Sequence, residues 1–372
     1  MRRLNRYIYQ QAAWPNFFWN EAKILQHLIA IRHRQGKLLG RMESLGFSLQ
    51  SEASLSVLTL DVLKSSEIEG QILNPDQVRS SVARRLGMDI AGLVSSDRHV
   101  DGVVELMLDA TQNFNLPLTQ KRLFGWHASL FPTGSSGLYQ ITTGAWRDNK
   151  KGPMQVVSGP MGHERIHYEA PDARLVHKEM TQFLKWFNHK DTMDAVLKSA
   201  IAHLWFVTIH PLDDGNGRIA RAIADIQLAR SEGSPHRFYS MSAQIKQERN
   251  AYYNILEKTQ KGSLDITNWL EWFLNCLDHA LTATDTTLKS TMAKARFWET
   301  HRLNSFNARQ LAMLNKILDG FVGKLTSSKW AKISKCSQDT ALRDIQDLID
   351  QKILLQDSAG GRSTSYLLVN DN

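Results

Sequence analysis

One short stretch of the chain concentrates residues suited to acid–base and phosphate chemistry. It is His210-Pro211-Leu212-Asp213-Asp214-Gly215-Asn216-Gly217-Arg218-Ile219-Ala220-Arg221, called the motif loop below. Gly215 and Gly217 allow positive φ, so successive backbone N–H groups can turn inward, and a helix that begins near Arg218 would add its positive end. The spacing therefore predicts a phosphate-binding loop between two helices.

The side chains of the motif loop supply the groups that a transfer of phosphate to a hydroxyl requires. Arg218 and Arg221 lie three residues apart and can offer forked donors to phosphate oxygens. Asp214 can hold a Mg²⁺ ion that bridges two phosphates. His210 can accept a proton from an incoming hydroxyl. This set of residues indicates phosphoryl or nucleotidyl transfer.

Two other patterns in the sequence resemble known binding motifs but lack the neighbouring elements that those motifs require. Gly215-x-Gly217-x-x-Ala220 is part of a dinucleotide-binding fingerprint, but a helix precedes it and the next strand-like patch, residues 237–241, ends without an acidic residue. Residues 163–167, His-Glu-Arg-Ile-His, match the zinc-protease pattern, but nearby prolines leave barely two helical turns, so we expect extended chain there. An ordinary polar turn between helices remains an alternative for the motif loop.

Apolar residues at helical spacing predict the elements that must position the motif loop. The stripes cover residues 19–39, 54–63, 103–107, 123–130 and 194–207. The last of them runs into His210. Residues 144–171 carry Gly, Pro and the β-branched patch 155–158, which predicts a small hairpin. The C-terminal seventy residues have the pattern helix, helix, helix, hairpin, with Ser337 placed to cap the third helix.

Composition excludes several classes of protein. The chain has 372 residues, of which 42% are hydrophobic and 22% charged, so it is not mainly disordered. Cys276 and Cys336 lie sixty residues apart, which leaves neither a disulfide framework nor a thiolate metal cage. Eighteen uncharged apolar residues never run together, so we expect a cytoplasmic protein without a membrane span. The net charge is +8, and residues 1–50 carry eight Lys or Arg against two acidic residues, which favours phosphate-bearing ligands.

The motif loop resembles the defining motif of the Fic family, His-x-Phe-x-(Asp/Glu)-Gly-Asn-Gly-Arg-x-x-Arg. Leu212 replaces the usual Phe, and we expect its side chain to be buried. The resemblance extends to the patch at 155–158 and to the stretch from Ser242 to Trp269. It implies a mainly α protein: an all-helical Fic fold with a small β-hairpin flap, plus a C-terminal winged helix-turn-helix domain. The expected divisions are an N-terminal helical region with an inhibitory helix (1–95), a Fic catalytic core (96–290) and the winged helix-turn-helix (300–372).

This resemblance implies a protein adenylyltransferase, which moves AMP from ATP to a Ser, Thr or Tyr hydroxyl of a target protein and releases pyrophosphate. His210 would deprotonate the hydroxyl, Asp214 would hold Mg²⁺ on the α- and β-phosphates, and Arg221 would pair with the γ-phosphate. Val156 and Val157 of the flap would hold the target segment by backbone hydrogen bonds. The remaining phosphate and adenosine contacts would come from Gly215, Asn216, Gly217, Arg218, Tyr253 and Gln260.

Residues 65–70, Ser-Ser-Glu-Ile-Glu-Gly, resemble the (Ser/Thr)-x-x-x-Glu-(Gly/Asn) inhibitory motif of one class of the family. Glu69 would reach Arg221 and occupy the donors intended for the γ-phosphate, so ATP would bind with its α-phosphate turned away from the attack line. The inhibitory residues implied are Ser65 and Glu69. The alternative is that a Ser–Glu pair near a helix end is ordinary surface chemistry.

The C-terminal segment resembles a winged helix-turn-helix. As a DNA reader it would place the helix from Ser337 in the major groove and Arg362 in a wing on the backbone. Residues 301–372 hold ten Lys or Arg and seven acidic residues, so docking of a protein or of a second protomer, as in a homodimer, remains open. Two rival functions also remain: a Fic enzyme with another phosphate-containing donor, and a DNA-binding regulator that keeps the motif loop as a nucleotide sensor.

Overall fold

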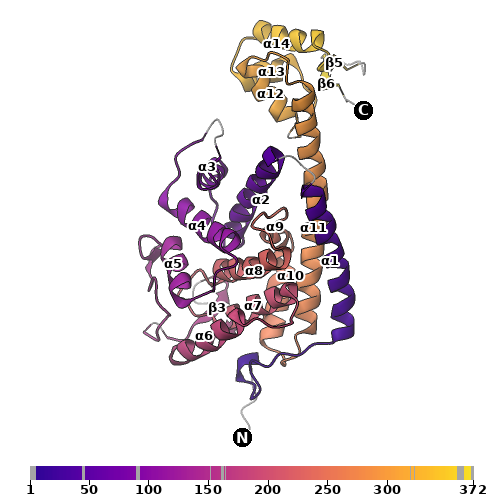
Figure 1. The fold of residues 1–372 in the computed structure, drawn as a ribbon. Helices are drawn as coiled ribbons and strands as arrows, with labels where there is room; N and C mark the ends of the chain where they lie inside the picture. The colour runs from indigo at the N-terminus through magenta and orange to yellow at the C-terminus, as the bar shows by residue number, and fades with distance from the viewer. Residues whose placement is uncertain are drawn as a thin grey trace. The chain divides into compact units, whose positions relative to one another are not determined.

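Two adjacent helices, α7 (Ala195–Ile209) and α8 (Asn216–Glu232), lie at the centre of the larger of the two units into which the chain divides (Figure 1). These units are Met1–Thr284 and Asp285–Asn372. The structure is a computed structural model, and it describes residues 6–43, 47–88, 93–150, 152–160, 163, 165–318, 320–321, 323–357 and 364–369. Within it the chain is mainly helical, as the sequence predicts.

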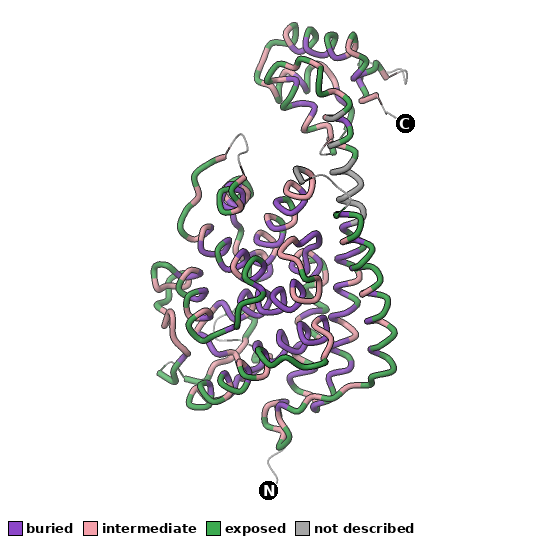
Figure 2. Tube along the Cα trace, in the orientation of Figure 1, coloured by how far each residue is buried: buried purple, intermediate pink, exposed green. Residues whose placement is uncertain are grey.

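Helices α7 and α8 are buried over most of their surfaces. Every residue of α7 from Val196 to Ile209 is buried, and so is most of α8 (Figure 2). A helix that is apolar on all sides belongs in the interior of a domain, because no face of it favours water. One buried charge of α8 is paired within the core: Asp225 Oδ1 accepts a bond of 2.8 Å from Arg237 Nη1. The motif loop therefore joins two helices that the core holds in place.

The other helices of the first unit surround this pair. They are α1 (Glu21–Glu43), α2 (Phe47–Ile68), α3 (Pro75–Arg85), α4 (Arg98–Gln112), α5 (Gln120–Leu130), α6 (Ala173–Asn188), α9 (Met241–Gln247), α10 (Arg249–Gln260) and the first part of α11 (Thr267–Thr300), preceded by the short 3₁₀ helix η1 (Ile8–Gln10). α1 runs beside α11, where Arg34 Nη1 lies 3.1 Å from Asp278 Oδ1. Gly70, at φ 81°, follows the end of α2, a left-handed conformation that glycine adopts readily after a helix.

Within the described residues there are three short hairpins, two in the first unit and one in the second. β3 (Gln155–Ser158) pairs antiparallel with β4 (Arg165–Glu169), so the predicted flap is a hairpin, and a register shift falls between Val156 and Val157. β4 also gives residues 165–167 the extended conformation expected there, while Glu164 lies outside the described residues. A second hairpin, β1 (Ser135–Ser136) with β2 (Tyr139–Gln140), occupies a stretch for which the sequence patterns predicted no strand. Gly137, at φ 55°, allows its tight connection.

The second unit contains α12 (Ala308–Leu318), α13 (Ser327–Ser334), α14 (Gln338–Asp350) and the hairpin of β5 (Leu354–Gln356) with β6 (Tyr366–Leu368). Trp330 and Ile345 lie in its apolar core. The Ser337 hydroxyl accepts a bond of 3.2 Å from Thr340 N and caps α14. The order of elements is the predicted one, whereas assignment to the winged helix-turn-helix family stays a prediction and Arg362 lies outside the described residues.

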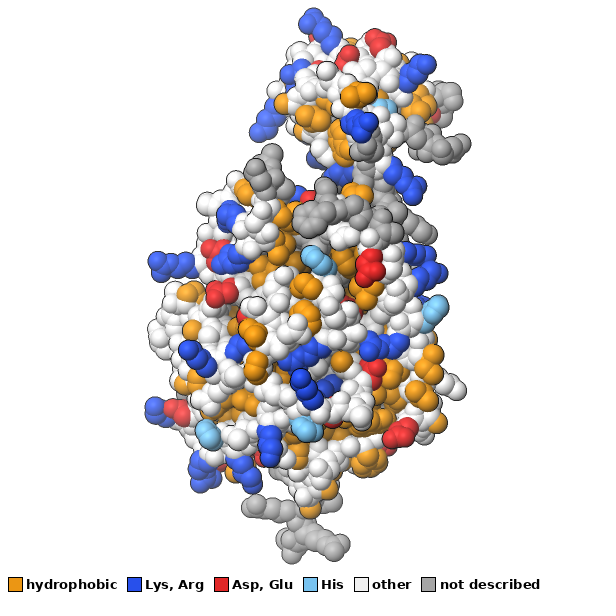
Figure 3. Space-filling view, viewed as in Figure 1, with side chains coloured by type: hydrophobic (Ala, Val, Ile, Leu, Met, Phe, Trp, Pro, Cys, Tyr) orange, Lys and Arg blue, Asp and Glu red, His pale blue; other side chains and the backbone are white. Residues whose placement is uncertain are grey.

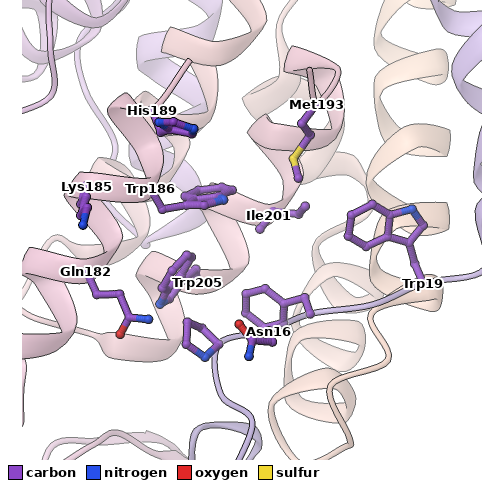
Figure 4. Close-up of a pocket in the computed structure, with 11 residues that line it drawn as sticks. Asn16, Trp19, Gln182, Lys185, Trp186, His189, Met193, Ile201 and Trp205 are labelled. Atoms are coloured by element: carbon purple, nitrogen blue, oxygen red, sulfur yellow. The ribbon is translucent and has the colours of Figure 1, made fainter. Parts of the chain in front are cut away.

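Surface features away from the motif loop are of two kinds. An aromatic pocket of about 580 Å³ is lined by Trp186 and Trp205 on one side and Trp19 on the other, and no residue of the motif loop lines it (Figure 4). On the face drawn in Figure 3, Lys and Arg side chains are scattered and form no continuous stripe.

Within the described part of the chain, none of the helices combines the length and the apolar character needed to cross a membrane.

Candidate active site

The motif loop is a closed turn between the two central helices. α7 ends at Ile209, and His210 adopts the left-handed conformation at φ 51° and ψ 58°. The Asn216 side chain closes the loop, because its Nδ2 donates to Leu212 O at 2.8 Å and its Oδ1 accepts from Leu212 N at 3.0 Å. Leu212 is fully buried, as expected for the position where the family motif has Phe. Asn216 thus shapes the loop, and its phosphate contact stays a prediction.

The two glycines of the motif loop serve different purposes. Gly215 adopts φ 78° and precedes α8, which begins at Asn216 and not near Arg218 as expected. Gly217 lies inside the first turn of α8, so the expectation of positive φ at that position is wrong. A Cβ atom at Gly217 would lie 2.2 Å from Glu69 Oε1. Gly217 is therefore explained by the close approach of Glu69.

His210 stands at one lip of the loop with its imidazole held in a single orientation. Its Nδ1 lies 3.2 Å from Val207 O. A carbonyl can only accept, so Nδ1 carries the proton and Nε2 keeps a free lone pair. The ring is partly exposed but closely surrounded by protein, and this desolvation lowers the pKa of His210 to about 4. His210 is therefore neutral at pH 7 and able to accept a proton at Nε2.

Arg218 and Arg221 lie on the first turns of α8 and are 1% and 2% exposed. Arg218 Nη1 donates to Gln71 Oε1 at 2.7 Å, and the guanidinium lies 5.0 Å from the centre of the Phe131 ring. Arg221 donates to the Ser65 hydroxyl at 2.9 Å and to Ser65 O at 2.8 Å.

Each arginine keeps one buried nitrogen, Arg218 Nε and Arg221 Nη1, without a hydrogen-bond partner among the described residues. The N-terminus of α8 also has no side-chain cap. Buried donors without partners are costly, and a helix N-terminus attracts negative charge, so this region fits an anion.

Glu69 lies directly against Arg221. Its Oε1 is 2.9 Å from Arg221 Nη2, and its side chain is 30% exposed. Burial alone would lower the pKa of Arg221, but the Glu69 carboxylate raises it. The carbonyls just before Glu69 are also held, because Lys246 Nζ donates to Glu67 O at 2.9 Å and Arg249 Nε to Ile68 O at 3.1 Å. Ser65 and Glu69 thus both occupy Arg221, from the C-terminal end of α2.

Asp214 lies on the same loop with a partly exposed carboxylate. Its Oδ2 accepts a hydrogen bond from the Ser136 hydroxyl, which comes from hairpin β1–β2. A carboxylate oxygen is a donor that Mg²⁺ takes, and one or two carboxylates completed by substrate phosphates are a common magnesium site. Among the described residues there is no group of three or more His, Cys, Asp or Glu that could hold a metal by itself. Asp214 therefore fits Mg²⁺ only together with bound phosphates.

The two residues expected to contact adenosine lie on α10 at different depths. The guanidinium carbon of Arg249 lies over the Tyr253 ring, 5.1 Å from its centre, and the Tyr253 hydroxyl lies 3.5 Å from Ile68 O. Gln260 is 6% exposed, and its amide donates to Val207 O at 3.3 Å. Tyr253 thus lies beside the end of α2, whereas Gln260 supports the end of α7. Both adenosine contacts stay predictions.

The flap is joined to α10 by a pair that the sequence did not indicate. His167 Nδ1 lies 2.6 Å from Glu257 Oε2, and His167 Nε2 lies 2.6 Å from the Ser158 hydroxyl. Val156 and Val157 lie on β3 next to Ser158, and Val157 is 47% exposed. Gln71 and Arg147, which also contact the motif loop, were missed too. They lie 147 and 63 residues from their partners, so no local spacing signals them.

Comparison with known proteins agrees with this geometry. Residues 117–228 match the Fic/DOC family, and residues 7–88 match a domain of unknown function, DUF4172. Proteins named protein adenylyltransferase Fic from Drosophila melanogaster and Drosophila sechellia are 34% identical to the chain over 231 residues, and that from Drosophila yakuba is 27% identical. Each match covers 59% of the chain and 40% of the relative, so the chain matches less than half of these proteins.

Solved structures show the same fold. A Fic family protein from Desulfovibrio desulfuricans aligns with a TM-score of 0.52 at 20% identity, covering 93% of the chain and 97% of that protein. A Fic domain containing signaling protein from Bacteroides thetaiotaomicron aligns with a TM-score of 0.50 at 19% identity, covering 71% and 95%. Residues 117–228, which contain the whole motif loop, are a Fic domain of the Fic/DOC family.

Proposed function

We propose that this protein is an adenylyltransferase that moves AMP from ATP to a hydroxyl of a target protein and is held off by Glu69. The observation that carries the proposal is the pair Arg218 and Arg221, both buried, each with a nitrogen that has no partner among the described residues. They lie at the uncapped N-terminus of α8, on the loop that also carries the neutral His210. Relatives named protein adenylyltransferase support the same chemistry.

His210 acts as the general base in this proposal. Its Nε2 accepts the proton of the target hydroxyl while the hydroxyl oxygen attacks the α-phosphorus of ATP. The bond from the α-phosphorus to the bridging oxygen breaks, and pyrophosphate leaves. The pKa of His210, lowered to about 4, keeps the lone pair available at neutral pH.

Arg221 binds the γ-phosphate, and Arg218 with the first amides of α8 binds the inner phosphates. Mg²⁺, held by Asp214 and the phosphates, would neutralise charge on the triphosphate. Both strands of the flap have outward-facing apolar side chains, Val157 and Ile166, 47% and 39% exposed. An extended target segment could add to this hairpin by backbone hydrogen bonds.

Inhibition follows from competition for Arg221. The Glu69 carboxylate occupies Arg221 Nη2 and stands against Gly217, where the terminal phosphate would have to lie. Two negative groups cannot share one buried guanidinium without repulsion, so a triphosphate must displace Glu69 or bind misaligned. The resting protein is therefore nearly inactive, and removal of Glu69 activates it.

The test is label transfer by the Glu69→Gly variant from α-labelled ATP with Mg²⁺ in a cell lysate, followed by mass spectrometry of the labelled peptides. We expect a Ser, Thr or Tyr that carries AMP. His210→Ala in the same background removes the base and should abolish transfer while ATP binding persists. A bare phosphate or another nucleotide on the peptide would instead favour a Fic enzyme with a different donor, and transfer that survives His210→Ala would refute the assigned base.

A further inference from the structure

The end of α7 sets the position of His210, and its backbone is unusual there. The last carbonyls of a helix have no partners within the helix. His210 also adopts φ 51° and ψ 58°, a left-handed conformation that costs a non-glycine residue about 1 kcal/mol. Such a conformation persists only when the surroundings hold it. The groups that bind these carbonyls therefore decide where the imidazole points.

Arg147 binds the last carbonyl of α7 and the two carbonyls that follow it in the motif loop. Its side chain is 4% exposed, although it belongs to the irregular stretch between hairpins β1–β2 and β3–β4. Arg147 Nε donates to His210 O at 2.7 Å, Arg147 Nη2 lies 3.4 Å from Ile209 O, and the backbone N–H of Arg147 donates to Pro211 O at 2.9 Å. One residue thus spans three successive carbonyls, from the last residue of α7 into the motif loop.

The same guanidinium connects the motif loop to the base of α6. Arg147 Nη2 also donates to Pro171 O, just before α6 begins. Neighbouring carbonyls have other partners: the Tyr168 hydroxyl donates to Thr208 O at 2.6 Å, and His210 Nδ1 and Gln260 Nε2 meet Val207 O. Among the described contacts, the bonds to the carbonyls of residues 209–211 come from Arg147. A lysine could not reproduce this arrangement, because its ammonium is one point charge without the planar fork.

We propose that Arg147 is a positioning residue that holds the His210 imidazole in line for proton abstraction by fixing the carbonyls of residues 209–211. It does not touch the reacting atoms. The proposal rests on the function proposed above, because it assigns His210 as the base. A displacement of about 1 Å at a reacting group can cost about a hundredfold in rate. Loss of the fork should therefore lower kcat while the KM for ATP, set by Arg218 and Arg221, changes little.

The experiment compares Arg147→Lys and Arg147→Met with the parent, all in the Glu69→Gly background. We expect Arg147→Lys to lower kcat by about a hundredfold and KM for ATP to change less than threefold, with Arg147→Met at least as impaired. Arg237→Lys is the matched control, since Arg237 is equally buried but pairs with Asp225 away from the loop. It should lower the melting temperature and leave kcat per folded molecule unchanged.

A second readout does not depend on activity. Long-range ¹H–¹⁵N spectra report which nitrogen of a neutral imidazole carries the proton, and the His210 signal is assigned by its loss in His210→Asn. We expect His210 to be only in the Nδ1–H form when Arg147 is present, and in a mixture of the Nδ1–H and Nε2–H forms in Arg147→Lys. Unchanged kcat and an unchanged tautomer in Arg147→Lys would overturn the proposal, as would a kcat loss no larger than that of Arg237→Lys. If the Glu69→Gly parent transfers nothing, the proposed function fails, and the tautomer result still tests Arg147.

Discussion

Removal of the Glu69 carboxylate should activate the enzyme, and the size of the effect follows from the ion pair. Glu69 Oε1 lies 2.9 Å from Arg221 Nη2, and the guanidinium is 2% exposed. A hydrogen bond between charged groups contributes about 1.5–3 kcal/mol, and each 1.4 kcal/mol is a factor of ten in an equilibrium constant. Because Glu69 is 30% exposed, we take the lower half of this range. Glu69→Gly should therefore raise label transfer by at least about tenfold.

The assay is initial-rate transfer from α-labelled ATP, including self-labelling, at saturating Mg²⁺. Glu69→Gln gives an intermediate rate, because the amide keeps a hydrogen bond but loses the charge. Glu67→Gly is the matched control: it makes the same change two positions earlier, where the carboxylate pairs with Lys64 Nζ at 2.8 Å and not with Arg221. It should leave the rate low. Equal labelling by the Glu69→Gly variant and the unchanged chain would refute inhibition through Arg221.

Three further outcomes follow from the site and from the second unit. In the Glu69→Gly variant, kcat/KM should stay constant from pH 8 to about 5.5 and fall only below about 5. Desolvation lowers the pKa of His210 to about 4, and the imidazole stops acting as a base only when it is protonated. A fall in kcat/KM with a midpoint near pH 6.5 would contradict this expectation. Removal of Mg²⁺ with EDTA should abolish AMP transfer. Asp214→Asn should raise the Mg²⁺ concentration needed for half-maximal rate by about tenfold, because a charged ligand is lost. An unchanged Mg²⁺ requirement in this variant would show that Asp214 does not hold the ion. The exposed face of α14 carries three acidic residues, Asp339, Asp347 and Asp350, and one basic residue, Arg343. Anisotropy titration of the full chain with duplex DNA at 0.15 M salt should therefore show no binding tighter than about 1 µM, the upper end of non-specific affinities. Sequence-selective nanomolar binding would instead favour a DNA-binding regulator.

Much of the fold could be predicted because its signals are local. The stripe over residues 194–207 and the Ser337 cap each depend on neighbours within a few residues, and each appears where the spacing indicated. The start of α8 was placed two residues late, because Gly217 suggested a turn whereas it lies in the helix to admit Glu69. Hairpin β1–β2 was missed because its strands have two residues each, too few for an alternation pattern.

The residues of the candidate site and one of their contacts, Glu69 with Arg221, could be predicted, but most of the contacts could not. The types and spacing of residues 210–221 indicated phosphate binding and a general base, and the resemblance to the Fic family indicated Ser65 and Glu69 as inhibitory residues. Sequence alone could not show that Asn216 closes the loop on Leu212, or that Gln71 and Arg147 hold Arg218 and His210. These contacts join residues that are distant in the chain, so only the packed fold brings them together.

Binding of the triphosphate at residues 210–221 can be observed in a crystal structure of the Glu69→Gly variant with ATP and Mg²⁺. We expect the γ-phosphate on Arg221, the inner phosphates at the N-terminus of α8, and the α-phosphorus within reach of a hydroxyl that His210 Nε2 could deprotonate. A triphosphate bound away from residues 210–221, or an α-phosphorus facing away from His210, would contradict it.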